Sequence, residues 1–271
     1  MKKSMLGIVI AAFLVFGIAG QAAAYYDLGS LVLSLYAEPN GDKTDNEVGV
    51  HLLDAGAVPT TTITAITPID LSRLDCPPGA VCSGDFTTTS DWADINVGVW
   101  GANGQTGDKW VATANMPTDG DYDVASATQI LQTAAQTGMV AYAPADAADG
   151  TTDGRAVIST ANLNSYDVLF NSNSAVAGSQ AGFNADVAGQ LGEVALADLD
   201  TVGYVDMYLW YSNDQAAFHT IDDPIGIIRL GLNASDCLYA ELRPVPLPGA
   251  VVLLGSGLLG LVGIRRRSAT A

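Results

Sequence analysis

Short runs in which apolar and polar residues alternate are the feature that most limits how this chain can fold. Residues 31–35 place leucine at every second position, and residues 47–52 alternate Val48, Val50 and Leu52 with Glu47, Gly49 and His51. A period of two puts successive side chains on opposite faces of a β-strand. Gly, Asp, Asn and Pro cluster between these runs, as they do in the turns of antiparallel β-proteins.

The same pattern recurs along most of the chain. It predicts further strands at residues 61–67, 94–100, 109–114, 139–143, 155–160, 204–211, 226–232 and 238–242. About ten short strands predict an all-β fold, an antiparallel β-sandwich of the jelly-roll type. Residues 123–136 have helical spacing instead and predict one amphipathic helix, and residues 144–154 predict a long surface loop.

The N-terminus is typical of a secretory signal peptide. Lys2 and Lys3 precede the apolar stretch 5–19, and three alanines end at Ala24. A basic start, an apolar centre and small residues at the end predict cleavage after Ala24. Residues 1–24 are therefore expected to be absent from the mature protein, and residues 25–243 are expected to form its single globular body.

The C-terminal segment, residues 244–271, combines a proline elbow, an uncharged run and a basic end. Together they predict a transmembrane helix with its arginines on the cytoplasmic side. The sequence VPLPGAVVLLGSGLLGLVGIRRR resembles the PEP-CTERM sorting signal of exported bacterial proteins, in a VPLP variant that has Leu247 where that signal has glutamate. The residues that carry this resemblance are Val245, Pro246, Leu247, Pro248, Arg265, Arg266 and Arg267.

The resemblance implies a partner and a location. Such signals are handled by an exosortase, a membrane-embedded transpeptidase-like protease, and the proteins are mostly found at the cell surface or in an exopolysaccharide matrix. The segment is then cut off, or it stays as a single-pass anchor. An ordinary C-terminal membrane helix is the alternative.

The charge of the body excludes one class of partner. Residues 25–243 hold six of the eleven basic residues and all 29 acidic ones, a formal net charge of −23. Such a surface repels nucleic acid and anionic lipid, and it suits an exterior protein, divalent cations or basic partners. We therefore expect no nucleic-acid binding.

The three cysteines raise the question of pairing. Cys76 and Cys82 flank the turn-prone spacer Pro-Pro-Gly-Ala-Val, which predicts a local disulfide in an exported protein. Cys237 is then left over, and a buried apolar role suits it better than a reactive one.

Two groups of residues are candidate binding sites. Asp119, Asp121 and Asp123 alternate in one loop and could supply oxygen ligands to Ca²⁺; the alternative is that they form a solvated turn and cap a helix. In residues 204–211 the alternation places Tyr204, Asp206, Tyr208 and Trp210 on one face, and the aromatic side chains of this row, above all Tyr208 and Trp210, could stack on sugar rings if they are exposed. The alternative is that this strand is buried on both faces.

These observations predict a non-catalytic protein of the cell surface or exopolysaccharide matrix. A carbohydrate-binding module is the first alternative, and a secreted glycan-active enzyme is the second. An enzyme of that kind would need two carboxylates at a defined separation, and the sequence does not single out a pair. No cofactor other than the candidate Ca²⁺ is expected.

Overall fold

The computed structural model describes most of residues 26–245. The stretches within that range that it does not describe are 38–45, 64–68, 72–80, 83–84, 87–90, 104, 115–135, 149–152, 171–192 and 214–223.

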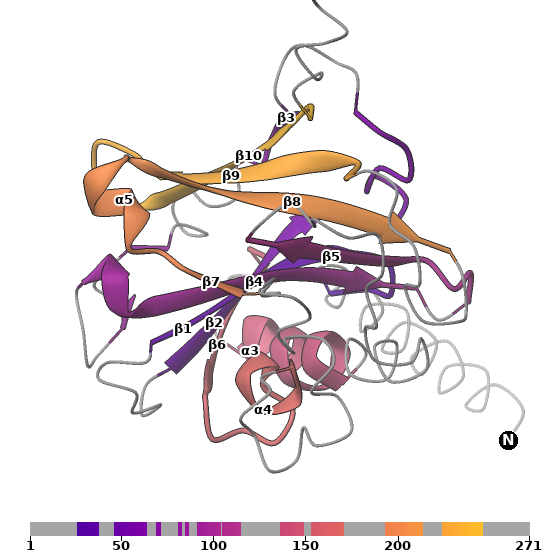
Figure 1. Cartoon of the computed structure of the whole chain (residues 1–271). Coiled ribbons are helices and arrows are strands. Elements are labelled where there is room, and N and C mark those ends of the chain that lie inside the picture. The colour runs from indigo at the N-terminus through magenta and orange to yellow at the C-terminus, as the bar shows by residue number, and fades with distance from the viewer. Residues whose placement is uncertain are drawn as a thin grey trace, which may run out of the picture.

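One antiparallel β-sheet, strongly curled into a half-barrel, organises the described part of the chain (Figure 1). Its order is β3-β10-β9-β8-β5-β4-β1-β2-β6, and β7 pairs with β4 off this path. The strands are β1 (Leu31–Ala37), β2 (Asn46–Leu53), β3 (Ile69–Asp70), β4 (Ile95–Ala102), β5 (Lys109–Thr113), β6 (Arg155–Ser159), β7 (Glu193–Ala195), β8 (Tyr204–Ser212), β9 (Gly226–Leu232) and β10 (Leu238–Arg243).

The inner face of the curl holds the main hydrophobic core. Leu33 of β1, Val97 of β4 and Met207 of β8 belong to one buried cluster, which extends from β2 to β10. Strands distant in the sheet order contribute to the same cluster because the sheet curls around it. The apolar side chains at alternate strand positions therefore form one buried core. The removal of their apolar surface from water is the main driving force of folding.

The outer face of the sheet is covered at one end by short helices. A π-helical turn, η4 (Gln136–Tyr142), continues into α3 (Ala143–Ala148), and α4 (Tyr166–Phe170) lies beside them below the strands in Figure 1. The buried side chains under this cover form a second cluster, here called the covered patch. Its members are Tyr26, Val32, Tyr36, Trp100, Ala102, Val111, Ala141, Tyr142, Ala156, Ile158, Tyr166, Leu169 and Trp210.

The segment from Val81 to Phe86 connects two strands that are far apart in the sheet order. Cys82 is disulfide-bonded to Cys237, which directly precedes β10, and the Leu238 N–H donates to the Val81 carbonyl at 2.8 Å. The Asp85 carboxylate forms a 2.7 Å ion pair with Arg155 on β6. Val81 and Phe86 are buried in the inner core. The described residues of this segment, here called the strap, therefore tie β10 and β6 together across the half-barrel.

The predicted local disulfide between Cys76 and Cys82 is wrong, because Cys82 pairs with a cysteine 155 residues away in sequence. Cys237 is buried, as expected, but it is a disulfide partner and not a free apolar side chain. Cys76 lies outside the described residues. Proximity in the sequence favoured a disulfide between Cys76 and Cys82. The fold instead brings the start of β10 beside the strap, so that Cys237 lies next to Cys82.

The prediction of an antiparallel β-fold is confirmed, whereas the two stacked sheets of a sandwich are not observed, since the described strands form a single sheet. The strand predicted at 139–143 is wrong, and the loop predicted at 144–154 begins as helix α3. Met139 and Val140 are exposed while Ala141 and Tyr142 are buried, which is helical and not alternating burial. The helix predicted at 123–136 lies, except for its last residue, outside the described part.

The signal peptide ending at Ala24 and the C-terminal segment from Pro246 onward also lie outside the described residues. Within the part of the chain that is described, no helix is long and apolar enough to cross a membrane.

Candidate functional site on the outer face

The structure separates the residues of the predicted aromatic row. Trp210 is only 1% exposed, and its indole N–H donates to the Thr113 hydroxyl at 2.9 Å within the covered patch. Tyr208 is half-buried against the same cluster. The expectation that Trp210 forms part of an exposed sugar-stacking row is therefore wrong. The alternative, burial on both faces, holds for the C-terminal half of β8.

Asp119, Asp121 and Asp123 lie outside the described residues. Elsewhere, among the residues that are described, no group of three or more His, Cys, Asp or Glu side chains is arranged to hold a metal ion.

The most unusual group beneath the helical cover, next to the covered patch, is the fully buried carboxyl of Glu47 on β2. Its Oε1 accepts hydrogen bonds from the Tyr142 hydroxyl at 2.6 Å and from the Tyr166 N–H at 2.7 Å. Its Oε2 accepts one from the Asp167 N–H at 2.8 Å. One side chain thus joins β2 to η4 and to the first turn of α4, where backbone N–H groups have no partner within the helix.

The polar contacts continue away from Glu47. The Tyr142 hydroxyl also lies 2.8 Å from the Ser34 hydroxyl on β1, and Ser34 in turn accepts from the Trp100 indole N–H at 2.9 Å. The Tyr26 hydroxyl lies 2.9 and 2.8 Å from the carbonyl oxygens of Gly49 and Gly154. Buried polar groups are costly unless they are paired, so this network fixes how the helices sit on the sheet.

Burial dominates the ionisation of this network. Desolvation raises the pKa of Glu47 to about 7, against the opposing effect of the hydrogen bonds from Asp167, Tyr142 and Tyr166. Burial likewise raises the pKa of Tyr142 well above its usual range, with the Glu47 charge as the next cause. Burial of the Glu47 carboxyl therefore favours its protonated form more than in an exposed glutamate. Because it is fully buried, we assign it a structural role in holding the helices.

Two glycines make room for the tyrosines of the helical cover. A Cβ built on Gly49 of β2 would lie 2.4 Å from the Tyr142 ring, and one on Gly98 of β4 would overlap the Tyr166 hydroxyl. Both glycines lie on the outer face, because Gly49 and Gly98 each pair with Ser34. Each tyrosine therefore packs directly against strand backbone.

Beyond the covered patch, the same outer face becomes polar and partly exposed on β8, β9 and β10. We call this part the paired-charge patch, since its charged side chains bind one another. It consists of Tyr204, Asp206, Arg229, Tyr239, Glu241 and Arg243. The cross-strand register sets its layout, because Arg229 lies between Asp206 on β8 and Glu241 on β10.

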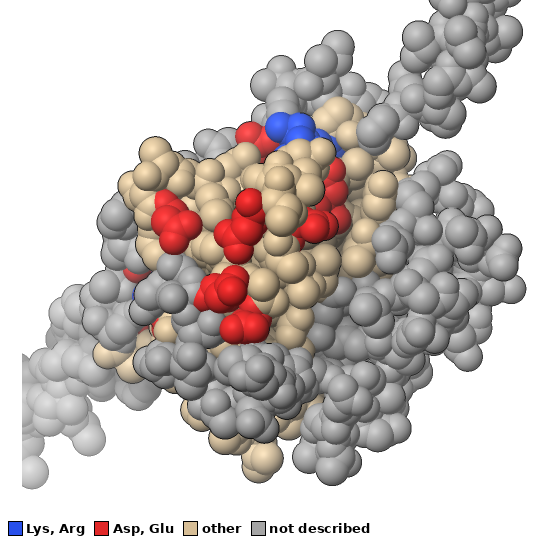
Figure 2. Space-filling model, turned by 60° about the vertical axis from the view of Figure 1, so that its left-hand side comes forward, with Lys and Arg blue, Asp and Glu red and all other residues tan. Residues whose placement is uncertain are grey.

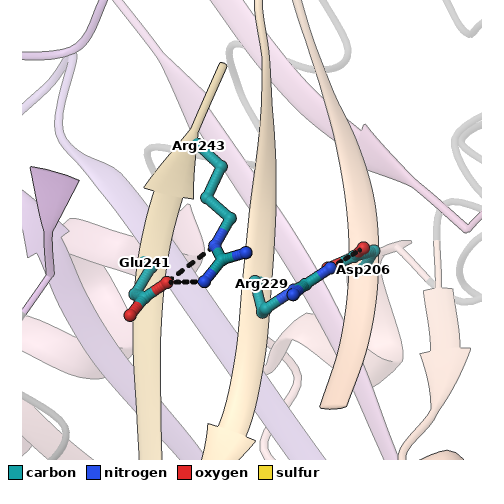
Figure 3. Close-up of polar contacts among 4 residues, drawn as sticks. All are labelled: Asp206, Arg229, Glu241 and Arg243. Carbon is teal, nitrogen blue, oxygen red and sulfur yellow. Dashed lines mark hydrogen bonds and ion pairs between the residues drawn. The ribbon is translucent and has the colours of Figure 1, made fainter. Parts of the chain in front are cut away.

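The two arginines of this patch each bind a carboxylate (Figure 3). Arg229 donates from Nε and Nη2 to the two oxygens of Asp206, both at 2.6 Å. Arg243 reaches back along its own strand, so that Nε and Nη2 both lie 2.7 Å from Glu241 Oε2. The hydrogen bonds with Asp206 raise the pKa of Arg229 above its usual value. Such forked pairs have a defined geometry as well as energy.

Two tyrosines flank Gly231 in the same patch. Tyr204 and Tyr239 both pair with Gly231, one from each side. The Tyr239 ring lies over the glycine, since a Cβ there would be 2.5 Å from its Cε1, Cζ and hydroxyl. The Arg229 guanidinium carbon stands 3.6 Å from the centre of the Tyr204 ring, a cation–π contact.

Sequence reasoning singled out neither Glu47 nor the residues that surround Asp206. The residues around Glu47 and Gly231 form no sequence motif that distinguishes a buried acid, or a glycine under an aromatic ring, from other strand residues. Their importance arises from register, which places Arg229 beside Asp206 and Tyr239 over Gly231. The one usable signal was the alternation of 204–211, which correctly placed Tyr204 and Asp206 on one face.

Comparisons with known proteins give no further guidance: no family model, curated protein or solved structure matches this chain.

Proposed function

We propose that this chain is an exported, non-catalytic protein of the bacterial cell surface or exopolysaccharide matrix. Its C-terminal segment directs it there, either as a single-pass anchor or as the substrate of an exosortase-type enzyme. In this proposal residues 25–243 form the exported body, the signal peptide ends at Ala24, and Val245–Pro248 and Arg265–Arg267 make up the sorting signal.

The observation that carries the proposal is the disulfide between Cys82 and Cys237. Disulfides persist in oxidising compartments outside the cytoplasm and are rare within it. This one indicates an exported protein, independently of the two terminal patterns. The acidic exterior is a second support: Figure 2 shows several Asp and Glu side chains on one face of the molecule, with a group of Lys and Arg near its upper edge.

The non-catalytic part of the proposal rests on how the carboxylates are used. Glu47 is buried and bonded to the helical cover, while Asp206 and Glu241 are each bound to an arginine of the same sheet. A general acid or base must reach the proton that it transfers. Glu47 joins the sheet to the helical cover, and Asp206 and Glu241 are each engaged by an arginine.

Location and processing can be tested by mass spectrometry of the protein isolated from its own cells. We expect a mature chain that starts at Tyr25 and carries the Cys82–Cys237 link, and a tail that is missing in cells with an exosortase. Protease added to intact spheroplasts should digest the body. A cytosolic protein that starts at Met1 with reduced cysteines would overturn the proposal.

The anchor and the processing signal can be distinguished by deletion. Removing residues 245–271 should release the body into the medium. If the mature wild-type protein retains the whole tail, including Arg265–Arg267, the anchor reading stands and the exosortase reading fails.

A further inference from the structure

The four charged side chains of the paired-charge patch form two ion pairs and carry no net charge, on a strongly acidic body. Within it Asp206 balances Arg229, and Glu241 balances Arg243, whereas the body as a whole carries a formal charge of −23. Two of the body's six basic residues lie here on neighbouring strands. An uncharged ligand experiences no net attraction or repulsion from such a surface, whereas an anionic polymer is repelled by its surroundings.

The ion pairs leave hydrogen-bonding groups at the surface. Arg229 uses Nε and Nη2 for Asp206, and Arg243 uses the same atoms for Glu241 Oε2. Among the described residues, the Nη1 groups of both arginines and Glu241 Oε1 have no hydrogen-bond partner. The side chains of Arg229, Glu241 and Arg243 are 20–34% exposed. Donors and an acceptor thus lie side by side in fixed positions, as a ligand rich in hydroxyl groups requires.

The aromatic rings complete the surface. Tyr239 rests with one side on Gly231, which fixes the ring against the sheet, and Tyr204 is 37% exposed. Their Cα atoms are two strands apart, about 10 Å, because neighbouring strands are about 4.8 Å apart. Rigid tyrosines offer an apolar surface beside a hydroxyl at little entropic cost on binding. Sugar rings have the matching combination of C–H faces and hydroxyl edges.

We propose that the paired-charge patch binds an uncharged polysaccharide. Tyr239 and Tyr204 contact the sugar rings, and Arg229, Arg243 and Glu241 hydrogen-bond to hydroxyl groups. The site is on the same strand as the aromatic row predicted from sequence, but it lies at the exposed N-terminal end of β8 and extends over β9 and β10. It does not require the export proposal, because binding is a property of the folded body.

The test is affinity electrophoresis of the oxidised full-length chain, purified in detergent, in gels that contain a soluble polymer. The neutral probes are a β-glucan, an α-glucan and a mannan, and the acidic probe is alginate. We expect at least one neutral polymer to retard the protein and alginate not to. Tyr239→Ala and Tyr204→Ala should each weaken retention about tenfold, as expected for loss of one aromatic contact. Arg243→Gln should weaken it about threefold.

A matched control is Arg155→Gln, which removes an arginine from a different ion pair, the one with Asp85. It should bind the polymer like the wild type once an unchanged circular dichroism spectrum shows that it is folded, and the patch variants should pass the same check. Absence of retention by all three neutral polymers, retention unaffected by Tyr239→Ala and Tyr204→Ala, or stronger retention by alginate would each overturn the proposal. So would a concentration-dependent dimer that only the patch variants dissociate, since the patch would then bind a second copy. None of these results bears on export, which is measured in cells.

Discussion

The inner face of the sheet is filled by side chains such as Leu33, Val97 and Met207, whereas the outer face beneath the helices encloses Glu47, Ser34 and Tyr142. Both regions are buried, but different interactions hold them together. The inner core depends on the apolar area that it removes from water, which is insensitive to pH and tolerates changes of shape. The covered patch depends on particular partners, because a buried polar group that loses its partner is costly.

The paired-charge patch extends this contrast along the outer face. Under the helices, the polar groups are satisfied by other parts of the chain. In the paired-charge patch the charged groups pair with one another and remain partly exposed. At one end of the outer face, polar side chains attach the helices to the sheet. At the other end, the charged side chains are partly exposed to solvent.

The largest effect should come from removing the link that closes the inner core. Replacing Cys82 and Cys237 together by alanine should lower the free energy of unfolding by about 5 kcal/mol, because the disulfide restricts a loop of roughly 155 residues in the unfolded chain. Urea unfolding of the double variant and the wild type measures the difference. A change under about 1 kcal/mol would mean that noncovalent contacts of the strap suffice.

A truncation within the inner core should be nearly as costly and independent of pH. Leu33 is fully buried, so Leu33→Ala should cost about 3 kcal/mol through lost apolar contact and the cavity left behind. The cost should be the same at pH 5 and pH 8, as measured by urea unfolding. If the loss of unfolding free energy in Leu33→Ala differed between pH 5 and pH 8, the inner core would also depend on a titrating group, against the contrast drawn between the two faces.

Glu47 should make the covered patch sensitive to pH. Its pKa rises from 4.5 in the unfolded chain to about 7 in the folded protein, so folding favours the protonated form. The stability that it contributes is fully present below pH 4.5 and is lost as the pH rises to about 7. The unfolding free energy of the wild type, measured relative to Glu47→Gln, should therefore fall by up to about 3 kcal/mol over this range.

The Glu47 comparison has a built-in control, because both proteins share all other titrating groups. A difference that stays constant from pH 4.5 to pH 8, or one that grows with pH, would show that Glu47 is ionised throughout. The hydrogen bonds from Tyr166 and Asp167 would then outweigh desolvation.

The smallest of these effects should come from filling a glycine position beneath the helices. Gly98→Ala should cost about 2 kcal/mol, because the new methyl group would overlap Tyr166. In the background of Tyr166→Ala the same substitution should cost much less, which a double-mutant cycle measures. Equal costs in both backgrounds would show that the helical cover adjusts without strain.

The sequence predicted the regions governed by local periodicity and missed those governed by distant contacts. Residues 226–232 were predicted as a strand with the bounds that β9 has, since alternation and flanking turns are both local. The strand predicted at residues 139–143 rested on the same alternation, but Tyr142 packs on Gly49, and η4 and α3 make these residues helical. Gly49, which makes room for the Tyr142 ring, is more than ninety residues away in the sequence, so the local pattern around Tyr142 does not reveal this contact.

The candidate sites divide in the same way. The face of Tyr204 and Asp206 could be predicted, because their spacing is two. The burial of Trp210, the partner of Cys82 and the position of Arg229 could not, since each depends on which strand becomes the neighbour. The register between strands is set only when the sheet assembles. A single sequence shows which residues of one strand share a face, but not which residues of another strand lie beside them.

The separation of Cys82 and Cys237 also orders the events of oxidation. A chain exported from its N-terminus presents Cys76 and Cys82 to the oxidising compartment before Cys237, which lies only 34 residues from the C-terminus. The first disulfide that can form is the local one, and the native one requires nearly the whole body to have crossed. Any early Cys76–Cys82 bond must then be exchanged by thiolate attack before the half-barrel can close. Under the export proposal, closure of the strap therefore has to wait until nearly the whole body has crossed the membrane.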